Sequence, residues 1–216
     1  MEINKLLTTV NYKKGNGKRN KYIVIHYVGA TGGAEANCKY FKNTYRGASA
    51  HYFVGHNGEV WQCVKDEDIS WHCGAQVYKH KEARNTNSIG VEMCCYKGAS
   101  GWYFTEQTIQ STITLVKELM QKHSIPVGNV IRHYDVTGKS CPEPYVRDAK
   151  AWDNFKAKLT TGANTKPATV TKDITAIAKE VIQGKWGNGE ERKKKLFLAG
   201  YNYNEVQKEV NRLLRG

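Results

Sequence analysis

A short run of small and polar residues divides the chain into two parts. Residues 160–170 read TTGANTKPATV, with one glycine, one proline and no apolar periodicity. Such a stretch offers no face that a core could bury, which is typical of a linker between domains. A chain of 216 residues is long enough for one well-packed domain and a small second one. We therefore predict a first domain over residues 1–159, a linker over 160–171 and a second domain over 172–216.

Strand-like and helix-like patterns alternate along the first part. Lys21–Val28 is rich in β-branched and aromatic residues, which is typical of a buried strand, and Ser88–Cys94 has the same character. Asn57 and Gly58 separate two alternating runs, a pattern that predicts a β-hairpin because both turn positions need positive φ. Helices are expected over 34–46, 105–123 and 149–159, and a short strand over 129–132. The alternation predicts an α/β fold with a mixed central β-sheet flanked by helices.

The second part shows a purely helical pattern. Apolar residues fall on one helical face before Gly184, again before Gly200, and again after Asn204. These three segments predict a small all-α three-helix bundle. A part of about 45 residues buries only a modest core, so we expect its exposed aromatic residues to serve binding.

The net charge of +13 predicts a polyanionic partner, either a nucleic acid, an acidic membrane surface or an anionic cell wall. Lysine and arginine outnumber aspartate and glutamate on both sides of the linker. No apolar run reaches the roughly 18 residues that a membrane span needs, so we expect no membrane insertion. Met1–Lys21 lacks the apolar core of a secretory signal, so we expect no signal peptide. The six cysteines are expected to be free thiols or metal ligands.

Histidine and cysteine residues that can converge on a metal ion lie on one strand and one loop. A catalytic zinc site needs three protein ligands and an open position for water. His133 and Cys141 flank a tight loop, and His26 in the first strand can supply the third ligand. Seven histidines and six cysteines also offer other triples. On spacing alone, His26 as a packed strand residue and Cys141 as a small buried residue stay open as alternatives.

Several separated motifs of the first part resemble the type 2 N-acetylmuramoyl-L-alanine amidases, a family that includes phage endolysins and the peptidoglycan recognition proteins. The resemblance covers about Tyr22 to Trp152, and the motifs occur in the family's order. Its landmarks are Val24-Ile-His26, Ser49-Ala-His51-Tyr-Phe-Val54, Trp71-His-Cys-Gly74, Asn87-Ser-Ile-Gly-Val-Glu92 and the loop from His133 to Lys139-Ser-Cys141-Pro142. The family resemblance implies the same mixed α/β fold that the alternation predicts.

The resemblance also implies a zinc site and two catalytic residues. By this resemblance, His26, His133 and Cys141 bind Zn2+. Glu92 is implied to be the base that takes a proton from water, and Lys139 the group that stabilises the oxyanion. Without the resemblance, Glu92 is interpreted as an exposed strand carboxylate and Lys139 as a solvated loop lysine.

A substrate cleft is implied as well. The residues that match its lining are His51, Trp71, His72, Arg84 and Asn87. Arg84 is expected to pair with stem-peptide carboxylates. His72 is alternatively a second electrophile near the oxyanion, and Trp71 alternatively a structural residue. In short phage amidases a tyrosine precedes the hairpin histidine; here that position is Ala50, which leaves the base role to Glu92.

The second part resembles the small wall-binding repeat called CW-seven, which occurs in phage lysozymes. The segments that carry the resemblance are Gly184-Lys-Trp-Gly-Asn-Gly189 and Ala199-Gly-Tyr-Asn-Tyr203. The resemblance implies recognition of the glycan–peptide unit of the wall, and we expect Arg192, Tyr201 and Asn202 to contact it. Alternatively, Trp186 and Tyr201 close the bundle. A weak homodimer through this part is a further alternative that the sequence does not show.

The combined prediction is a peptidoglycan hydrolase that uses zinc-activated water to cleave the amide bond between N-acetylmuramic acid and L-alanine of the stem peptide. Two alternatives stay open: a non-catalytic peptidoglycan receptor of the same fold, and an endopeptidase that cuts within the stem peptide. We expect a phage or prophage endolysin that stays in the host bacterial cytoplasm until lysis and then acts on the cell wall; an autolysin has the same sequence features. A nucleic-acid partner rests on charge alone and is not expected.

Overall fold

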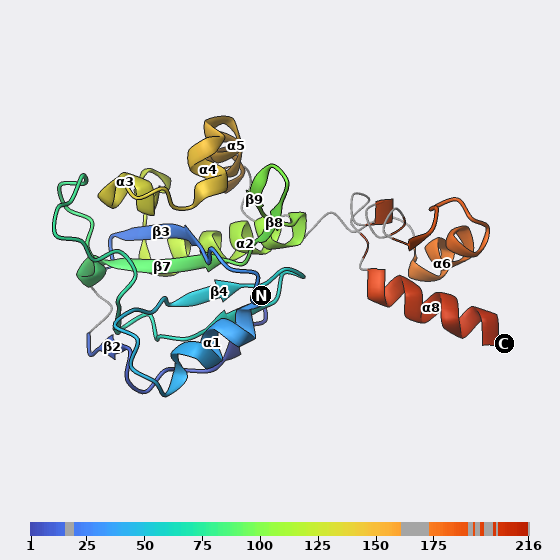
Figure 1. The fold of residues 1–216 in the computed structure, drawn as a ribbon, viewed down its shortest axis with the longest axis horizontal. Helices are drawn as coiled ribbons and strands as arrows, with labels where there is room; N and C mark the ends of the chain where they lie inside the picture. Colours follow the sequence, from blue (N-terminus) through green and yellow to red (C-terminus); the bar gives the residue numbers. More distant parts are fainter. Residues whose placement is uncertain are drawn as a thin grey trace. The chain divides into compact units, whose positions relative to one another are not determined.

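The structure, a computed structural model, describes residues 1–15, 20–160, 173–189, 192, 195–196, 201 and 203–215. The chain divides into two compact units, residues 1–161 and 162–216. Among the described elements, Figure 1 shows strands and helices in the first unit and helices in the second. The predicted linker over 160–171 lies outside the described residues, apart from Thr160.

A six-stranded sheet forms the centre of the first unit. Its strands are β1 Asn4–Lys5, β3 Tyr22–Tyr27, β4 Tyr52–Val54, β5 Val60–Gln62, β7 Ser88–Met93 and β10 Val130–Arg132. They lie in the order β1-β5-β4-β7-β3-β10. Strand β3 is parallel to both of its neighbours, β7 and β10, while β4 is parallel to β7 and antiparallel to β5. The predicted mixed α/β sheet is therefore confirmed.

Two small antiparallel sheets lie beside the central one. They are formed by β2 Tyr12–Lys13 with β6 Ile69–Ser70, and by β8 Tyr96–Gly98 with β9 Gly101–Tyr103. Strands β4 and β5 form the hairpin that the Asn57-Gly58 pair predicts. Gly58 has a φ of +84°, a conformation that glycine adopts without steric cost.

The described part of the first unit also holds five helices and two short 3-10 turns. They are α1 Ala34–Lys42, α2 Glu106–His123, α3 His133–Thr137, α4 Glu143–Arg147, α5 Ala149–Thr160, η1 Asn85–Asn87 and η2 Val127–Asn129. Helix α1 ends at Lys42, before the predicted end at Arg46. The reason is the buried Asn11, whose amide donates to the carbonyls of Phe41 and Thr44, at 2.7 Å each. These bonds replace the next helical turn.

The sheet is covered by helices on both faces. Helices α2 and α5 pack on one face and α1 packs over β4 and β5 on the other (Figure 1). Ile23 and Ile25 point into the core with α2 and α5, where each buried side chain of this size contributes about 2 kcal/mol. Because alternate residues of a strand face opposite sides, His26 lies on the face away from that core.

The second unit has a small apolar core of its own. Its described helices are α6 Ile174–Ile182 and α8 Tyr203–Arg215. The buried residues that form the core are Ile177, Ala178, Val181, Leu196, Tyr201, Val206 and Val210. The middle helix of the predicted bundle falls mostly on residues outside the described part of the chain.

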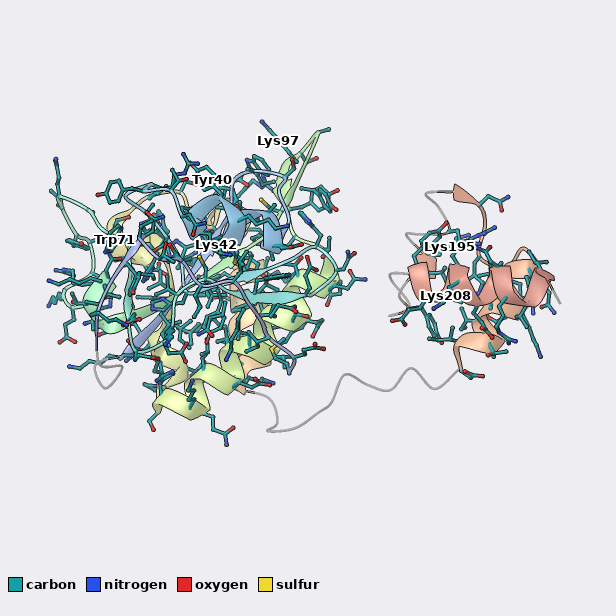
Figure 2. All side chains as sticks on the ribbon, turned by 90° about the horizontal axis from the view of Figure 1, so that it is seen from below. Tyr40, Lys42, Trp71, Lys97, Lys195 and Lys208 are labelled. Carbon is teal, nitrogen blue, oxygen red and sulfur yellow. The ribbon has the colours of Figure 1, made fainter. Side chains whose placement is uncertain are left out.

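Basic side chains lie at the surface of both units. Figure 2 shows Lys97 on the first unit and Lys195 and Lys208 on the second, and all three are exposed. The six cysteines are all buried and carry free thiols. Within the described ranges, no helix combines the length and the apolar character that a membrane crossing requires.

Candidate metal centre

Two adjacent strands bring a histidine and a carboxylate together. His26 on β3 and Glu92 on β7 are register partners. Partners on neighbouring parallel strands point to the same face of the sheet. Accordingly, His26 Nδ1 and Glu92 Oε1 lie 4.0 Å apart. His26 is 1% exposed, whereas the Glu92 side chain is 19% exposed and so stays within reach of a substrate.

Helix α3 holds the second histidine. Asp135 in its first turn accepts from the main-chain nitrogen of Arg132 at 2.9 Å and pairs with the Arg132 guanidinium, so the carboxylate stabilises the helix start at His133. The carbonyl of Cys141 accepts from the main-chain nitrogen of Tyr134 at 2.8 Å. The predicted loop is therefore a helical turn followed by a return segment, and it holds His133 and Cys141 on one compact unit.

The three predicted ligands converge. The donor atoms of His26, His133 and Cys141 all lie within 4.8 Å of one another, and all three residues are buried. Cys141 Sγ is 3.7 Å from His26 Nδ1, and the rings of His26 and His133 have centroids 4.7 Å apart. No other group of three such residues has this geometry in the described part of the chain.

The protonation states of the three residues suit a cation. Burial holds the pKa of His26 well below its usual value, and the charges of nearby histidines and Lys139 add to the effect. Burial and Lys139 lower the pKa of His133 to about 4. Both imidazoles are therefore neutral near pH 7 and keep a lone pair. Burial and the charge of Glu92 raise the pKa of Cys141 to about 12, so the thiolate needs a nearby cation to form.

Two buried polar atoms at this place have no hydrogen-bond partner among the residues that the structure describes. They are His133 Nδ1 and Glu92 Oε2. Buried polar atoms normally have a partner, and the exceptions occur where a ligand or a reaction uses them. Two imidazole nitrogens and one thiolate sulfur are a donor set that suits zinc. The residues present therefore fit a zinc ion.

Glu92 and Lys139 have the charge properties that their predicted roles require. Burial raises the pKa of Glu92 to about 7, while the charge of Lys139 opposes this rise. A carboxyl group that titrates near neutrality both accepts and returns a proton readily. Lys139 is exposed and follows Gly138, which ends α3 with a φ of +84°.

Two of the predicted cleft residues are histidines that point into the protein. His51 is fully buried, and its ring nitrogens bond to the carbonyl of Asp68, to Ser70 Oγ and to the main-chain nitrogen of Gly90. His72 Nδ1 lies 2.9 Å from His26 Nε2. Both positions suit support of the metal centre rather than direct contact with a substrate.

Of the other three predicted cleft residues, Trp71 and Arg84 lie on loops and Asn87 ends the 3-10 turn η1. Arg84 stacks on the Tyr78 ring at 3.8 Å and donates to carbonyls of its own loop. Asn87 accepts from the main-chain nitrogen of Arg84 at 2.8 Å. Trp71 is half-buried, and its ring lies 5.9 Å from that of the exposed Tyr45. Of the three, Trp71 therefore has a side chain best placed to meet a ligand.

The comparisons with known proteins decide the family. Residues 16–144, more than half of the chain, match the family N-acetylmuramoyl-L-alanine amidase. The chain belongs to this family. The resemblance drawn from the separated motifs is thereby confirmed. In the second unit, residues 175–214 match the CW_7 repeat, which confirms the CW-seven resemblance.

Curated relatives and solved structures agree with this assignment. A probable N-acetylmuramoyl-L-alanine amidase of Bacillus licheniformis is 32% identical over 197 residues, which cover 84% of this chain and 54% of the relative. CwlL of the same species is 31% identical, with the same coverage. The chain thus spans about half the length of these curated relatives. The structure of PlyL has a TM-score of 0.64 at 27% identity and covers 76% of this chain and 100% of PlyL. The catalytic domain of XlyA has a TM-score of 0.60 at 29% identity, with coverage of 74% and 99%.

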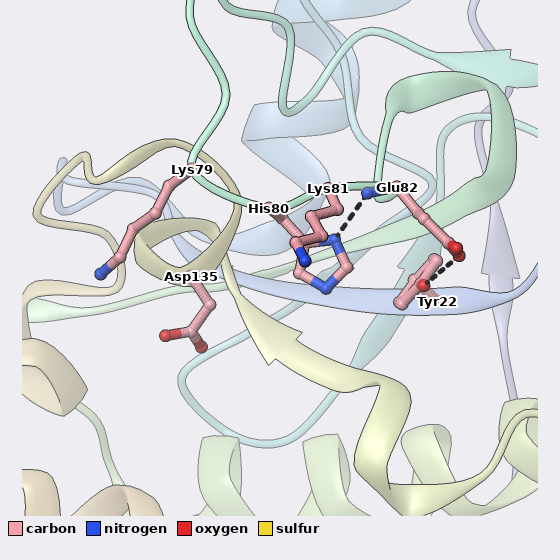
Figure 3. A pocket seen from close by; sticks show the side chains of 6 residues that line it. All are labelled: Tyr22, Lys79, His80, Lys81, Glu82 and Asp135. Atoms are coloured by element: carbon pink, nitrogen blue, oxygen red, sulfur yellow. Dashed lines mark hydrogen bonds between the residues drawn. The ribbon is translucent and has the colours of Figure 1, made fainter.

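A pocket of about 500 Å³ lies beside α3 in the first unit, residues 1–161, which we call the amidase unit (Figure 3). Its lining residues are Tyr22, Lys79, His80, Lys81, Glu82 and Asp135. Tyr22 begins β3, whereas His26 lies four positions further along the strand, a separation of about 13 Å at the usual rise of a strand. None of the predicted site residues lines the pocket, although Asp135 lies two positions after His133 in α3.

The amidase unit also uses residues that sequence reasoning missed. Tyr27 follows the predicted ligand His26, and its ring lies 6.0 Å from that of Trp102 on β9. Ser88 and Gly90 on β7 contact His72. The Gly90 position lies inside the Asn87–Glu92 motif, so the motif itself was the available signal. No local pattern distinguishes the half-buried Trp102 from the other aromatic residues of the unit.

In the CW_7 unit, the predicted wall contacts have structural partners. Tyr201 is 8% exposed and packs edge-on against Trp186, with ring centroids 5.9 Å apart. Arg192 donates to the carbonyl of Gly187 at 2.9 Å and to Asn188 Oδ1 at 2.7 Å. These contacts favour the alternative in which Tyr201 and Trp186 close the bundle. Asn202 lies outside the described residues.

Proposed function

We propose that the chain is a zinc-dependent N-acetylmuramoyl-L-alanine amidase that hydrolyses the amide bond between N-acetylmuramic acid and L-alanine in peptidoglycan. The observation that carries the proposal is the convergence of His26, His133 and Cys141 beside Glu92 in a chain of this family. Two Bacillus licheniformis relatives that are named as probable or established N-acetylmuramoyl-L-alanine amidases support it.

The three buried ligands are proposed to hold the zinc ion. When bound, zinc polarises the scissile carbonyl and lowers the pKa of a water molecule. The neutral imidazoles of His26 and His133 donate their lone pairs, and Cys141 donates as a thiolate. Because the set carries a single negative charge, the centre keeps a net positive charge that favours an oxyanion.

Glu92 is proposed as the general base and then the general acid. Its carboxylate takes a proton from the attacking water, and the same carboxyl group returns a proton to the leaving nitrogen. Its raised pKa, near 7, makes both transfers favourable. The partly exposed side chain and the unpartnered Oε2 leave the carboxylate free to do so.

Lys139 is proposed to stabilise the negative charge that develops on the carbonyl oxygen. Its positive charge lowers the pKa of His26, His133 and Glu92, and Lys139 lies two positions before Cys141 in the chain. A positioned cation of this kind favours the transition state over the ground state. Among the predicted cleft residues, Trp71 keeps its proposed role as a substrate contact.

The CW_7 unit is proposed to bind the wall. A single repeat binds weakly, but tethering raises the local concentration of the substrate around the amidase unit. The proposed contacts include Arg192, Tyr201 and Asn202, of which Tyr201 also closes the bundle core. We place the protein, as an endolysin, in the host bacterial cytoplasm until lysis and on the cell wall afterwards. Its partner is peptidoglycan, with no nucleic acid and no membrane insertion. The weak homodimer through the CW_7 unit stays open.

Fragment analysis of digested sacculi tests the activity. The expected products are peptides with free L-alanine amino termini and intact glycan strands, and a chelator should abolish them. New D-amino-acid termini would instead support the stem-peptide endopeptidase. Binding to sacculi without any cleavage would support the non-catalytic receptor, which the complete ligand set and Glu92 disfavour.

A further inference from the structure

The imidazole of His72 lies between the ligand His26 and the hydroxyl of Ser88. His72 Nδ1 is 2.9 Å from His26 Nε2, and His72 Nε2 is 3.1 Å from Ser88 Oγ. His26 directs its other nitrogen, Nδ1, toward Cys141 and Glu92. His72 therefore contacts His26 on the side away from the proposed zinc ion.

The hydroxyl of Ser88 determines the direction of these hydrogen bonds. Ser88 Oγ lies 2.6 Å from the carbonyl oxygen of Arg84, and a carbonyl can only accept, so the hydroxyl proton is used there. Ser88 Oγ must then accept from the N–H at His72 Nε2. A neutral imidazole has a single N–H, so His72 Nδ1 accepts from His26 Nε2. His26 Nδ1 is left as a lone pair.

We infer that His72 is a positioning residue which, together with Ser88 and the Arg84 carbonyl, holds His26 in the Nε2–H tautomer and so aims Nδ1 at the metal. The inference rests on the zinc site of the proposed function. Partners of this kind orient a metal-binding imidazole and raise its basicity, and their loss weakens metal binding by about 10–100-fold.

The neighbouring strand and loop fix the positions of the groups in this hydrogen-bonded relay, which runs from His26 through His72 and Ser88 to the Arg84 carbonyl. A Cβ atom on Gly90 would lie 2.5 Å from His72 Cγ, so only glycine lets the ring lie this close to β7. The Arg84 guanidinium and the Asn87 amide bond within their own loop, which fixes the carbonyl at the end of the relay. Arg84 and Asn87 thus acquire a role that does not require contact with substrate.

The tautomers can be observed directly. Nitrogen NMR of the full metal-free chain, labelled at histidine, distinguishes the protonated nitrogen of each ring. We expect Nε2–H at both His26 and His72. A proton at Nδ1 of either ring in the folded protein overturns the inference, and this measurement needs no activity and no metal.

Zinc affinity provides the second test. Competition with a chromophoric chelator should show about 10–100-fold weaker binding for Ser88→Ala and His72→Phe. His72→Asn keeps an acceptor near the Nδ1 position and should recover part of the loss. Gly90→Ala should displace His72 and weaken binding, whereas Gly128→Ala, with nothing within 4 Å of the added Cβ, is the matched control.

The outcomes separate this inference from the proposed function. Circular dichroism of each metal-free variant identifies those that stay folded. Unchanged zinc affinity in a folded Ser88→Ala or His72→Phe variant overturns the inference alone. A wild-type chain that binds no zinc overturns the proposed metal centre and, with it, the inference.

Discussion

Cys141 Sγ lies 3.7 Å from His26 Nδ1, although 115 positions separate the two residues. The contact exists because β3 and β10 are parallel neighbours and the chain returns from α3 to the end of β3. The thiol is buried where burial raises its pKa to about 12. A cysteine in this position therefore forms a thiolate readily only when a cation is bound beside it.

Replacing this thiol should remove the metal and the activity together. In Cys141→Ser the hydroxyl stays protonated and is a poor zinc ligand, so the zinc content measured by elemental analysis should fall well below one ion per chain. Activity on sacculi should fall by more than about 100-fold, since even outer partners of a ligand account for 10–100-fold. Cys95→Ala is the matched control, because Cys95 is equally buried but outside the ligand set.

Glu92→Gln should separate metal binding from turnover. The amide keeps the shape of the side chain but cannot take a proton, so zinc content should be unchanged while turnover falls by about 100- to 10,000-fold. Release of L-alanine amino termini measures the turnover. Full activity in this variant would rule out Glu92 as the base.

Lys139→Met should lower turnover and leave zinc bound. The variant keeps the length of the side chain and removes its charge, and the loss of one group that stabilises an oxyanion costs about 100-fold or more. The exposed Lys97, changed to methionine, controls for the loss of a surface charge. Equal turnover in Lys139→Met and Lys97→Met would contradict the proposed role of Lys139.

The fold and the convergence of His26, His133 and Cys141 could both be predicted, but for different reasons. The Asn57-Gly58 turn and the alternation of strands and helices are local patterns that do not depend on distant contacts. The triad of His26, His133 and Cys141 needed more than spacing, because many other triples were available. These three residues were predicted as the ligands from the ordered motifs of the family and not from geometry.

The support of the site could not be predicted in the same way. His51 and Arg84 share residue types with substrate contacts, but the sheet buries His51 and the loop engages Arg84. A sequence does not show which side of a ring faces a neighbour. The inferred role of His72 depends on the close approach of its ring to Gly90, which follows from the packing of a loop on β7 rather than from any local pattern.

Asp66 is a buried carboxylate that joins a loop to the end of α2. It accepts from Lys122 at 2.7 Å, from His123 at 2.9 Å, and from Gln62 and the hydroxyl of Tyr52. Asp66→Asn loses the charge and part of this network, so we expect a loss of about 1–3 kcal/mol in the free energy of unfolding at pH 7. Chemical denaturation of the wild-type and variant chains measures it.

This difference in the free energy of unfolding between the wild type and Asp66→Asn should disappear at acidic pH. Burial opposes ionisation of Asp66, but the hydrogen bonds from Lys122, Tyr52 and His123 outweigh it and hold its pKa below the ordinary value. A lowered pKa stabilises the folded state above the unfolded-state pKa, about 4 for aspartate, and the effect is lost as pH falls through the folded-state pKa. If the difference in the free energy of unfolding between the wild type and Asp66→Asn stays constant from neutral pH to below pH ~3, this account is contradicted.

Truncation after Leu159 should separate chemistry from wall attachment. The amidase unit has its own core and holds all three proposed zinc ligands, so turnover of soluble muropeptides should be unchanged. Sedimentation with sacculi should weaken, because the CW_7 unit is proposed to bind the wall and so to raise the local substrate concentration. The rate on intact walls should fall in parallel with the bound fraction. If the shortened chain sediments with sacculi as the full chain does, the CW_7 unit does not bind the wall, and its apolar core serves another purpose.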